Sequence, residues 1–425
     1  KLIYRILLSR TAILYALLDQ AFISAVNFLV IYLLSKWAGQ QVFFLFVIFQ
    51  SAGLLLITLS QSFAAQPLLT LRQPYRDKGA ERFYDCSVLI FNGALILAGA
   101  LLAGSLLSFS YGTSFVAIGS LVFYALGWAT YEVVRRIQYA DERPQVSAVA
   151  SLALLCFAIV LLYLYHSSLE EILLSLGVAY FFIALVEVGV WTIGVPWRPR
   201  IAKSLAFVTR GDGKPVVAQH WHYGKWVAPG SASFWVTTQA YLFLATGYLT
   251  VSDVSGLRTS QNIASVLTIL LVAVENYLTP RYAGIIDKEG VFRLQDHVKR
   301  HQHHIVLTSL SISIAGAPMI FIASWILYPE LGTTVHVLAT LFFAGYILQF
   351  ANRGYVCALR SMSITKPFAI AQVLAAVATL ALAFLALPFF GAIGGPLVFV
   401  IATLVFFGVI RQYYLKNVRP GLEAR

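Results

Sequence analysis

Long apolar runs, separated by short polar connections, extend along almost the whole chain. Twelve runs are long enough to cross about 30 Å of hydrocarbon as helices that rise about 1.5 Å per residue. Strict apolar–polar alternation, the signature of transmembrane barrel strands, is not the pattern here. Unpaired backbone groups are costly in lipid, so we predict that the spans are α-helices. They lie near residues 11–35, 42–69, 87–109, 114–134, 146–166, 171–194, 226–249, 255–280, 305–328, 334–358, 367–388 and 391–413.

The composition supports an all-α polytopic membrane protein. Of the 425 residues, 59% are hydrophobic and 11% are charged, whereas an ordinary soluble domain is about 25% charged. This deficit of charge excludes a soluble enzyme, a disordered chain and a disulfide scaffold. The three cysteines are also too few for a Cys-rich zinc module.

The positive charges predict the orientation of the spans. All but three of the 30 Lys and Arg residues lie in the terminal segments or in every second connection; the three exceptions are Lys36, Arg258 and Arg353. Positive residues accumulate on the cytoplasmic side, so both termini are predicted to be cytoplasmic. The net charge of +12 is then a topology signal, with anionic membrane lipids as expected neighbours. Its dispersal over separate loops argues against nucleic-acid binding.

The two halves of the chain resemble copies of each other. The second span carries Gln50 and ends near Pro67, and the eighth carries Gln261 and ends at Pro280; a basic stretch follows each. Each half begins and ends on the same side, which predicts a parallel repeat of two six-helix lobes. The predicted boundaries are an N-terminal lobe at 1–194 (helices 1–6), a cytoplasmic linker at 195–225 and a C-terminal lobe at 226–425 (helices 7–12).

Ionisable residues inside the spans are the main functional signal; they are Asp19, Glu132, Glu187, Arg258, Glu275 and Arg353. Each would cost roughly 2.5–3.5 kcal/mol near the bilayer centre if it faced lipid, so these side chains must face one another, a polar cavity or the interface. Structural interpretations stay open for four of them. Glu132 with Arg135 or Arg136 suits an interfacial ion pair, and Glu187 suits a buried, protonated structural residue. Arg353 and Arg258 suit side chains that snorkel to the headgroups.

Polar stripes occupy equivalent spans of the two halves. Arg258, Gln261 and Glu275 recur on the eighth span at steps of three and four, which places them on one helix face. Similar stripes lie on spans 1, 2 and 4 and on spans 7 and 10, whereas spans 3, 5, 11 and 12 are predicted to be outer, lipid-facing helices. We therefore expect one cavity shared by two lobes. The candidate cavity residues are Asp19, Gln20, Asn27, Arg135, Trp235, Gln239, Arg258, Gln261, Glu275, Gln349 and Arg353.

Other chemistry has little support in the sequence. The cluster His297, His301, His303 and His304 lacks a carboxylate or cysteine at a metal-binding spacing, so we interpret it as part of a basic interfacial helix. No phosphate-binding loop is present, and no outer connection is long enough for a catalytic site. We expect no catalytic residue, cofactor or metal.

One resemblance adds to this interpretation. Residues 17–39, which begin LLDQA and end KWAG, the segment QSF at 61–63 and the segment WVAPGS at 226–231 resemble bacterial polysaccharide flippases of the Wzx type. These belong to the multidrug/oligosaccharidyl-lipid/polysaccharide exporter superfamily. The resemblance covers most of the chain and rests on pattern rather than on a diagnostic motif. It implies a V-shaped pair of six-helix lobes that expose a central cavity alternately inward and outward.

The resemblance also implies a substrate, an oligosaccharide repeat unit on undecaprenyl diphosphate, and a place in the bacterial inner membrane. Arg258, Arg353 and Arg135 would meet phosphate, and aromatic side chains such as Tyr131 and Trp235 would stack on sugar rings. Coupling to a proton or sodium ion, through Asp19 or Glu275, is left open. Polysaccharide polymerase or export proteins are the expected partners of a monomeric transporter.

Three alternatives remain at this stage. A small-molecule or cation antiporter of the same superfamily would share the architecture. A membrane enzyme of polysaccharide assembly would need a catalytic outer loop. A scaffold for a polysaccharide synthase would not depend on the residues of the cavity.

Overall fold

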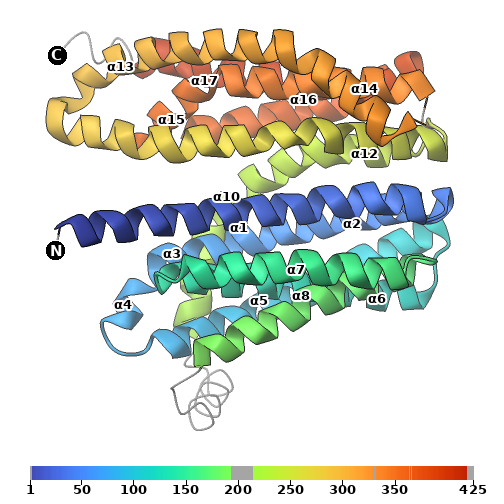
Figure 1. Ribbon diagram of the computed structural model, residues 1–425, viewed down its shortest axis with the longest axis horizontal. Coiled ribbons are helices and arrows are strands. Elements are labelled where there is room, and N and C mark those ends of the chain that lie inside the picture. The colour runs from blue at the N-terminus through green and yellow to red at the C-terminus, as the bar shows by residue number, and fades with distance from the viewer. Residues whose placement is uncertain (1, 193–213, 330–331, 363, 365, 419–425) are drawn as a thin grey trace. The chain divides into compact units, whose positions relative to one another are not determined.

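The computed structural model describes residues 2–418 apart from 193–213, 330–331, 363 and 365, and all structural statements below concern this part of the chain. It is built from α-helices with short π and 3-10 segments (Figure 1). In the first half the elements are α1 (Leu2–Trp37), α2 (Gln40–Ser60), η1 (Gln61–Ala65), α3 (Gln66–Leu71), α4 (Gln73–Arg76), α5 (Glu81–Tyr111), α6 (Phe115–Ala140), α7 (Pro144–Leu164) and α8 (Leu169–Thr192). They continue as α10 (Lys214–Trp235), η2 (Val236–Ala240), α11 (Tyr241–Ala245), α12 (Val251–Ala264), η3 (Ser265–Leu267), α13 (Thr268–Leu327), α14 (Gly332–Ala351), α15 (Arg353–Ser361), α16 (Lys366–Phe390), η5 (Gly391–Ile393), α17 (Gly394–Tyr413) and η6 (Tyr414–Val418).

Within this part of the chain, nine helical stretches are long and apolar enough to cross a membrane. One of them, Lys366–Lys416, contains both α16 and α17. The helices α10–α11 and α12 do not meet the same criterion, and these helices carry the polar stripe with Gln239, Arg258 and Gln261. The predicted all-α polytopic fold is confirmed.

The contacts divide the chain into two compact units, unit 1 (Lys1–Ala232) and unit 2 (Ser233–Arg425). Inside unit 1, α1 packs on α7, α5 on α6, α6 on α8, and α7 on α8. Inside unit 2, η2 and α11 pack on α16, α13 on α14, α14 on α17, and α16 on α17. Counted along each half, the same helix partners meet in both units, which supports the predicted internal repeat.

The boundary between the units falls inside α10. Most of this helix belongs to unit 1, and only its last residues, from Ser233, belong to unit 2. Part of the segment predicted as a linker, from Lys214 onward, is therefore regular helix, while 193–213 lie outside the described residues.

Local sequence signals explain several helix ends. Ser114 caps α6 by accepting a hydrogen bond from the amide of Ala117. Thr250 and Asp253 form a reciprocal capping box at the start of α12. Gly290 interrupts α13 with a φ of 83°, a conformation that glycine adopts without the steric cost of a Cβ atom. The long eighth connection predicted from the sequence is therefore two helical arms joined at this glycine.

Candidate functional site

The carboxylate of Asp19 is the centre of a buried polar cluster in unit 1. Asp19 lies on α1 and is fully buried. Arg135 on α6 donates from Nε to Asp19 Oδ2 at 2.8 Å, and its Nη2 lies 2.7 Å from the same oxygen. Tyr139, one helical turn further along α6, also donates to Oδ2, at 2.6 Å. Because isolated charge is costly inside a protein, these contacts are what allow a carboxylate at this position.

Two hydroxyl groups, one on α7 and one on α6, extend the cluster. Ser151 donates to Asp19 Oδ1, and the hydroxyl of Tyr131 lies 2.7 Å from Ser151 Oγ. A serine hydroxyl has only one proton to donate, so Tyr131 is the donor of the second bond. The hydroxyls therefore form a directed chain from Tyr131 through Ser151 to Asp19.

Arg135 joins further predicted residues to this cluster. Its Nη1 lies 3.4 Å from Glu132 Oε2, and its Nη2 donates to Gln20 Oε1 at 3.4 Å. Glu132 is thus an ion-pair partner of Arg135, as its structural interpretation predicted. Three of the candidate residues, Asp19, Gln20 and Arg135, are brought together. Asn27, about two turns beyond Asp19 on α1, is exposed and takes no part in these contacts.

One expectation about unit 1 is wrong. Tyr131 was expected to stack on sugar rings, but it is fully buried and engaged with Ser151. The fifth span was predicted to be an outer, lipid-facing helix, and apolar side chains such as Val149 and Tyr163 are indeed exposed on α7. Ser147 and Ser151 on the same helix are nevertheless fully buried. They stand four residues apart and so share one helix face, which was the available signal in the sequence.

Arg258 of unit 2 is held by two glutamine side chains. Its Nη1 donates to Gln239 Oε1 and to Gln261 Oε1, both at 3.2 Å. Gln261 in turn donates to the backbone carbonyl of Thr238. Gln239 and Thr238 lie in the π-helical segment η2, so the irregular turn is part of this arrangement. Amide oxygens carry no formal charge, so these two bonds orient the guanidinium group without neutralising it.

Glu275 is the partner of two arginines in the same unit. Arg353 Nη2 lies 2.8 Å from Glu275 Oε1, and Arg360 Nη1 lies 2.9 Å from Glu275 Oε2. Arg353 follows Asn352, where the helical axis breaks between α14 and α15. The predicted face of the eighth span is therefore split between two clusters, because Arg258 contacts glutamines while Glu275 contacts arginines.

The remaining candidates of unit 2 lie apart from these bonds. Gln349 on α14 is half-buried and takes no part in the bonds of the two arginine clusters described above. Trp235, also half-buried, packs against Phe243 with ring centroids 5.7 Å apart. Neither arrangement tests the roles predicted for them, which stay predictions.

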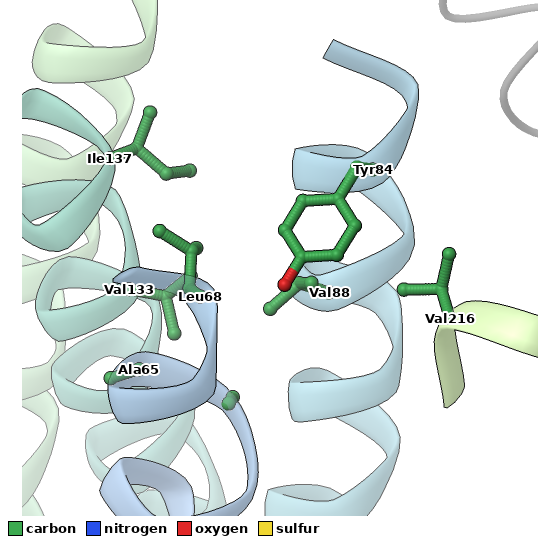
Figure 2. Packing of buried hydrophobic residues seen from close by; sticks show 8 residues of the cluster. Ala65, Leu68, Tyr84, Val88, Val133, Ile137 and Val216 are labelled. Carbon is green, nitrogen blue, oxygen red and sulfur yellow. The ribbon is translucent and has the colours of Figure 1, made fainter. Parts of the chain in front are cut away.

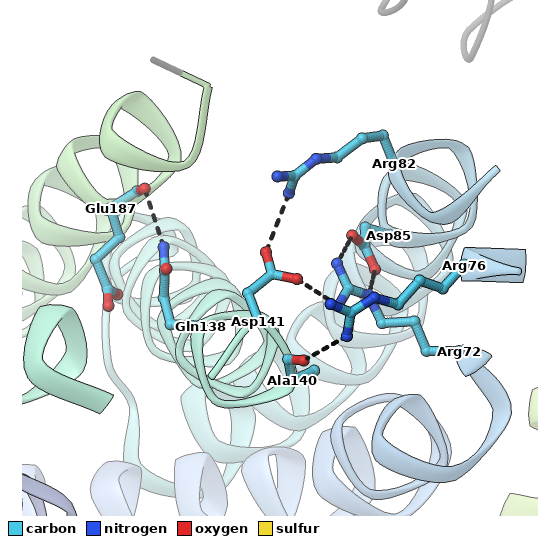
Figure 3. A network of polar contacts seen from close by, with 8 residues as sticks. All are labelled: Arg72, Arg76, Arg82, Asp85, Gln138, Ala140, Asp141 and Glu187. Carbon is cyan, nitrogen blue, oxygen red and sulfur yellow. Dashed lines mark hydrogen bonds and ion pairs between the residues drawn. The ribbon is translucent and has the colours of Figure 1, made fainter. Parts of the chain in front are cut away.

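A second ion network lies in unit 1 at the ends of α3, α5 and α6 (Figure 3). Arg72 donates to both oxygens of Asp85 at 2.8 Å and to Asp141 at 2.6 Å. Burial by itself would lower the pKa of Arg72, but the hydrogen bonds and charges of Asp85 and Asp141 raise it above its ordinary value. The sequence interpretation counted Arg72 only as a topology signal and did not predict this network.

The start of α10 is fixed to unit 1 through His220. Its Nδ1 lies 2.8 Å from the carbonyl oxygen of Phe63, and its Nε2 lies 2.7 Å from the hydroxyl of Tyr84. A carbonyl can only accept, so Nδ1 carries the proton and Nε2 accepts from Tyr84. Burial lowers the pKa of His220, which agrees with this neutral form. Tyr84 also belongs to a hydrophobic cluster that Val216 of α10 joins (Figure 2).

Among the described residues, no group of three or more His, Cys, Asp or Glu side chains is arranged to hold a metal ion. The interactions of the candidate residues are instead hydrogen bonds and ion pairs within each unit. In unit 1, two carboxylates contact the single guanidinium group of Arg135, so this cluster is net acidic. In unit 2, two arginines contact the single carboxylate of Glu275, so that cluster is net basic.

Comparison of the fold with solved structures gives long alignments at low sequence identity. An inward-facing multidrug resistance MATE family transporter of the MOP superfamily matches with a TM-score of 0.66 and 14% identity, covering 97% of this chain and 96% of that chain. Lipid II flippase MurJ in an inward closed conformation matches with a TM-score of 0.65 and 12% identity, covering 95% and 88%. The MATE transporter VcmN of Vibrio cholerae matches with a TM-score of 0.61 and 12% identity, covering 98% and 100%.

No protein-family model matches the sequence, and no curated protein matches it either. The likeness to the solved transporters therefore concerns the fold, the same two-lobed all-α architecture along nearly the whole chain. It does not test the Wzx-type branch that the sequence pattern resembles.

Proposed function

We propose that this chain is a flippase that moves an undecaprenyl-diphosphate-linked oligosaccharide repeat unit across the bacterial inner membrane, for polysaccharide biosynthesis, by alternating access. The fold supports a transporter of this superfamily, since its neighbours include MATE transporters and a lipid II flippase. The observation that carries the choice of substrate is the arginine excess in unit 2, where Arg353 and Arg360 share the carboxylate of Glu275.

A diphosphate group suits these arginines chemically. Guanidinium groups bind phosphate oxygens through two parallel N–H donors, and such charge-assisted bonds are roughly twice as strong as neutral ones. Arg360 is already half-exposed, so a phosphate can approach it without first breaking a buried pair. Arg258, oriented by Gln239 and Gln261, would supply a further cation for the same substrate.

The membrane potential would assist the proposed direction of movement. An inside-negative potential favours outward transfer of an anion by about 2.3 kcal/mol per charge per 100 mV. The proposal places both termini in the cytoplasm, where the positive residues of the connections would meet anionic lipids. It takes the protein to be a monomer that works beside polysaccharide polymerase or export proteins.

A cation antiporter is the second candidate, and the buried cluster of unit 1 favours it. Asp19 and Glu132 both contact the single guanidinium group of Arg135, which leaves carboxylate in excess. Such a cluster would attract small cations rather than a diphosphate.

One experiment separates the two candidates. We would delete the gene from its host and ask on which leaflet of the inner membrane lipid-linked oligosaccharide accumulates. The flippase proposal predicts accumulation on the inner leaflet, reversed by a plasmid copy of the chain but not by a copy with Arg353→Gln and Arg258→Gln. A normal leaflet distribution together with altered tolerance of cationic drugs would refute the flippase and support the antiporter.

A further inference from the structure

Glu187 on α8 is the most anomalous ionisable residue in the described structure. Only 1% of it is exposed, and within the described part of the chain no hydrogen-bond donor reaches either carboxyl oxygen. The neighbouring Gln138 does not satisfy it, because its amide donates at 3.3 Å to the backbone carbonyl of Glu187 (Figure 3). Buried polar groups are nearly always bonded in native proteins, so an orphan carboxyl group needs a physical explanation.

The explanation lies in the charge of the surrounding cluster. Electrostatic interactions connect Glu187 to Asp19, Arg135 and Glu132, and also to Tyr131. Three carboxyl groups thus act electrostatically on one guanidinium group, whose bonds go to Asp19 and Glu132. The other charged side chain near this site on α6 is Arg136, which interacts electrostatically with Tyr139. The sequences of α2 and α7, which also pack against α8, contain no charged residue.

An ionised carboxylate in such a position would have neither donors nor a counter-ion of its own. The cost of burying an unpaired charge is so large that the group takes up a proton instead. The protonated form of Glu187 also explains why Arg135 is committed to Asp19, although both acids lie within its electrostatic reach.

We propose that Glu187 is a proton-carrying group of unit 1, and that Arg135 exchanges its carboxylate partner between Asp19 and Glu187. In the observed state Glu187 holds the proton and Asp19 holds the guanidinium group. When Asp19 takes up a proton, Arg135 is released to Glu187, which gives its own proton to water. One proton enters, one leaves, and the total charge of the cluster is unchanged.

The hydroxyl chain on α6 and α7 is suited to this exchange. Asp19 accepts from Ser151, which accepts from Tyr131. Tyr131 lies within electrostatic reach of Glu187, although no hydrogen bond joins the two side chains in the described structure. Reversal of these donors is needed when Asp19 becomes a donor, and hydroxyl groups can reverse because each one both donates and accepts. A role of Glu187 in coupling protons to transport rests on the proposed function. The protonation of Glu187 itself does not depend on that function.

The test is infrared spectroscopy of the purified full-length protein in detergent at neutral pH. A protonated carboxyl group gives a carbonyl band separate from those of carboxylates, and we expect the band to be lost in Glu187→Gln. Glutamine is nearly isosteric with a protonated glutamate, so this variant should fold. The matched control Glu170→Gln removes an acid near the surface that accepts from Ser114, and it should leave the band in place. Persistence of the band in Glu187→Gln, or its loss in Glu132→Gln alone, would overturn the proposal.

Partner exchange has a separate signature. In Asp19→Asn the arginine loses the closer of its two carboxylates and keeps only the longer contact with Glu132, so we expect Glu187 to ionise and pair with it. The carboxyl band should then disappear, although Asp19 is not the residue that produces it. A band that survives in Asp19→Asn would show that Arg135 does not exchange partners. Neither measurement uses a substrate, so failure here is distinguishable from failure of the flippase proposal, which the leaflet assay tests.

Discussion

Arg135 places two guanidinium nitrogens against one carboxylate oxygen of Asp19, a residue 116 positions earlier in the chain. The contact joins α1 to α6 within unit 1, and both side chains are almost completely buried. Neither residue could be stable there alone, because each would be an uncompensated charge at membrane depth. The pair therefore stabilises unit 1. A change in the protonation of Asp19 would break the pair and so change the contact between α1 and α6.

Removing the cation should expose this dependence. We expect Arg135→Met to lower the free energy of unfolding by about 3–5 kcal/mol, because it leaves a buried carboxylate without its partner. The double variant Arg135→Met with Asp19→Asn should recover part of the loss, since neither charge remains. Thermal and denaturant unfolding in detergent would measure both. Equal stability of Arg135→Met and the native protein would contradict the assignment of this pair as a buried, mutually dependent one.

The arginines of unit 2 should matter for transport and little for folding. A hydrogen bond to a charged group is worth about 1.5–3 kcal/mol, so Arg353→Gln or Arg258→Gln should reduce export about 10- to 100-fold. The control is Arg281→Gln, an exposed arginine whose partner is Tyr277, which should export normally. The amount of folded protein should be similar in all three variants. Normal export by Arg353→Gln together with Arg258→Gln would disprove phosphate binding by these side chains.

The close packing of α10 against η1 predicts a sharp contrast between two glycines. A Cβ atom at Gly224 would lie 2.1 Å from Phe63 Cδ1, whereas one at Gly230 would meet nothing within 4 Å. Overpacking of this kind costs about 1–3 kcal/mol, so Gly224→Ala should destabilise unit 1. Gly230→Ala should be neutral or stabilising by up to about 1 kcal/mol, because alanine favours a helix. Unfolding measurements on both variants, made in the same detergent, check the contrast.

His220 should make the stability of unit 1 depend on pH. Burial lowers its pKa below the ordinary value of 6.5, so the unfolded chain binds more protons than the folded one between the two pKa values. Stability from this residue is therefore complete above pH 6.5 and falls as the pH is lowered through that range. His220→Asn keeps one donor and one acceptor without a titrating group, so its unfolding temperature should lose this part of the pH dependence. An unchanged pH profile in His220→Asn would refute the neutral bridge between Phe63 and Tyr84.

Several parts of the fold were predictable because they follow from local patterns. The apolar runs predicted most of the membrane spans, and helix is the structure that satisfies backbone hydrogen bonds within a single segment in lipid. The predicted spans at 226–249 and 255–280 are helical, but they are not among the nine stretches of the described chain that are long and apolar enough to cross a membrane. Asp19 was recognisable as an acid that needs a compensating partner, since charge at membrane depth must be compensated. Gln20 beside Asp19 and Gln261 beside Arg258 were also found correctly as members of polar stripes.

Other features could not be read from the spacing of residues. Ser151 looked like a helix-packing residue, and its bond to Asp19 depends on the packing of α7 against α1. Arg72 looked like one of many cytoplasmic cations, and only the approach of α3 to α5 pairs it with Asp85. The common face predicted for Arg258 and Glu275 became two clusters, because their partners come from different helices.

The sequence by itself determined the class of the protein, its membrane spans and the need for buried charges to be compensated, because hydrophobicity and charge act locally along a chain. Only the tertiary structure decided which acid holds which arginine and which carboxyl group is left without one. Those choices depend on contacts between residues far apart in the sequence, where one helix turn of displacement changes every partner. Glu187 shows the difference: the sequence marks it as a buried acid, but its orphan state exists only once the neighbouring helices have committed Arg135 to Asp19 and Glu132.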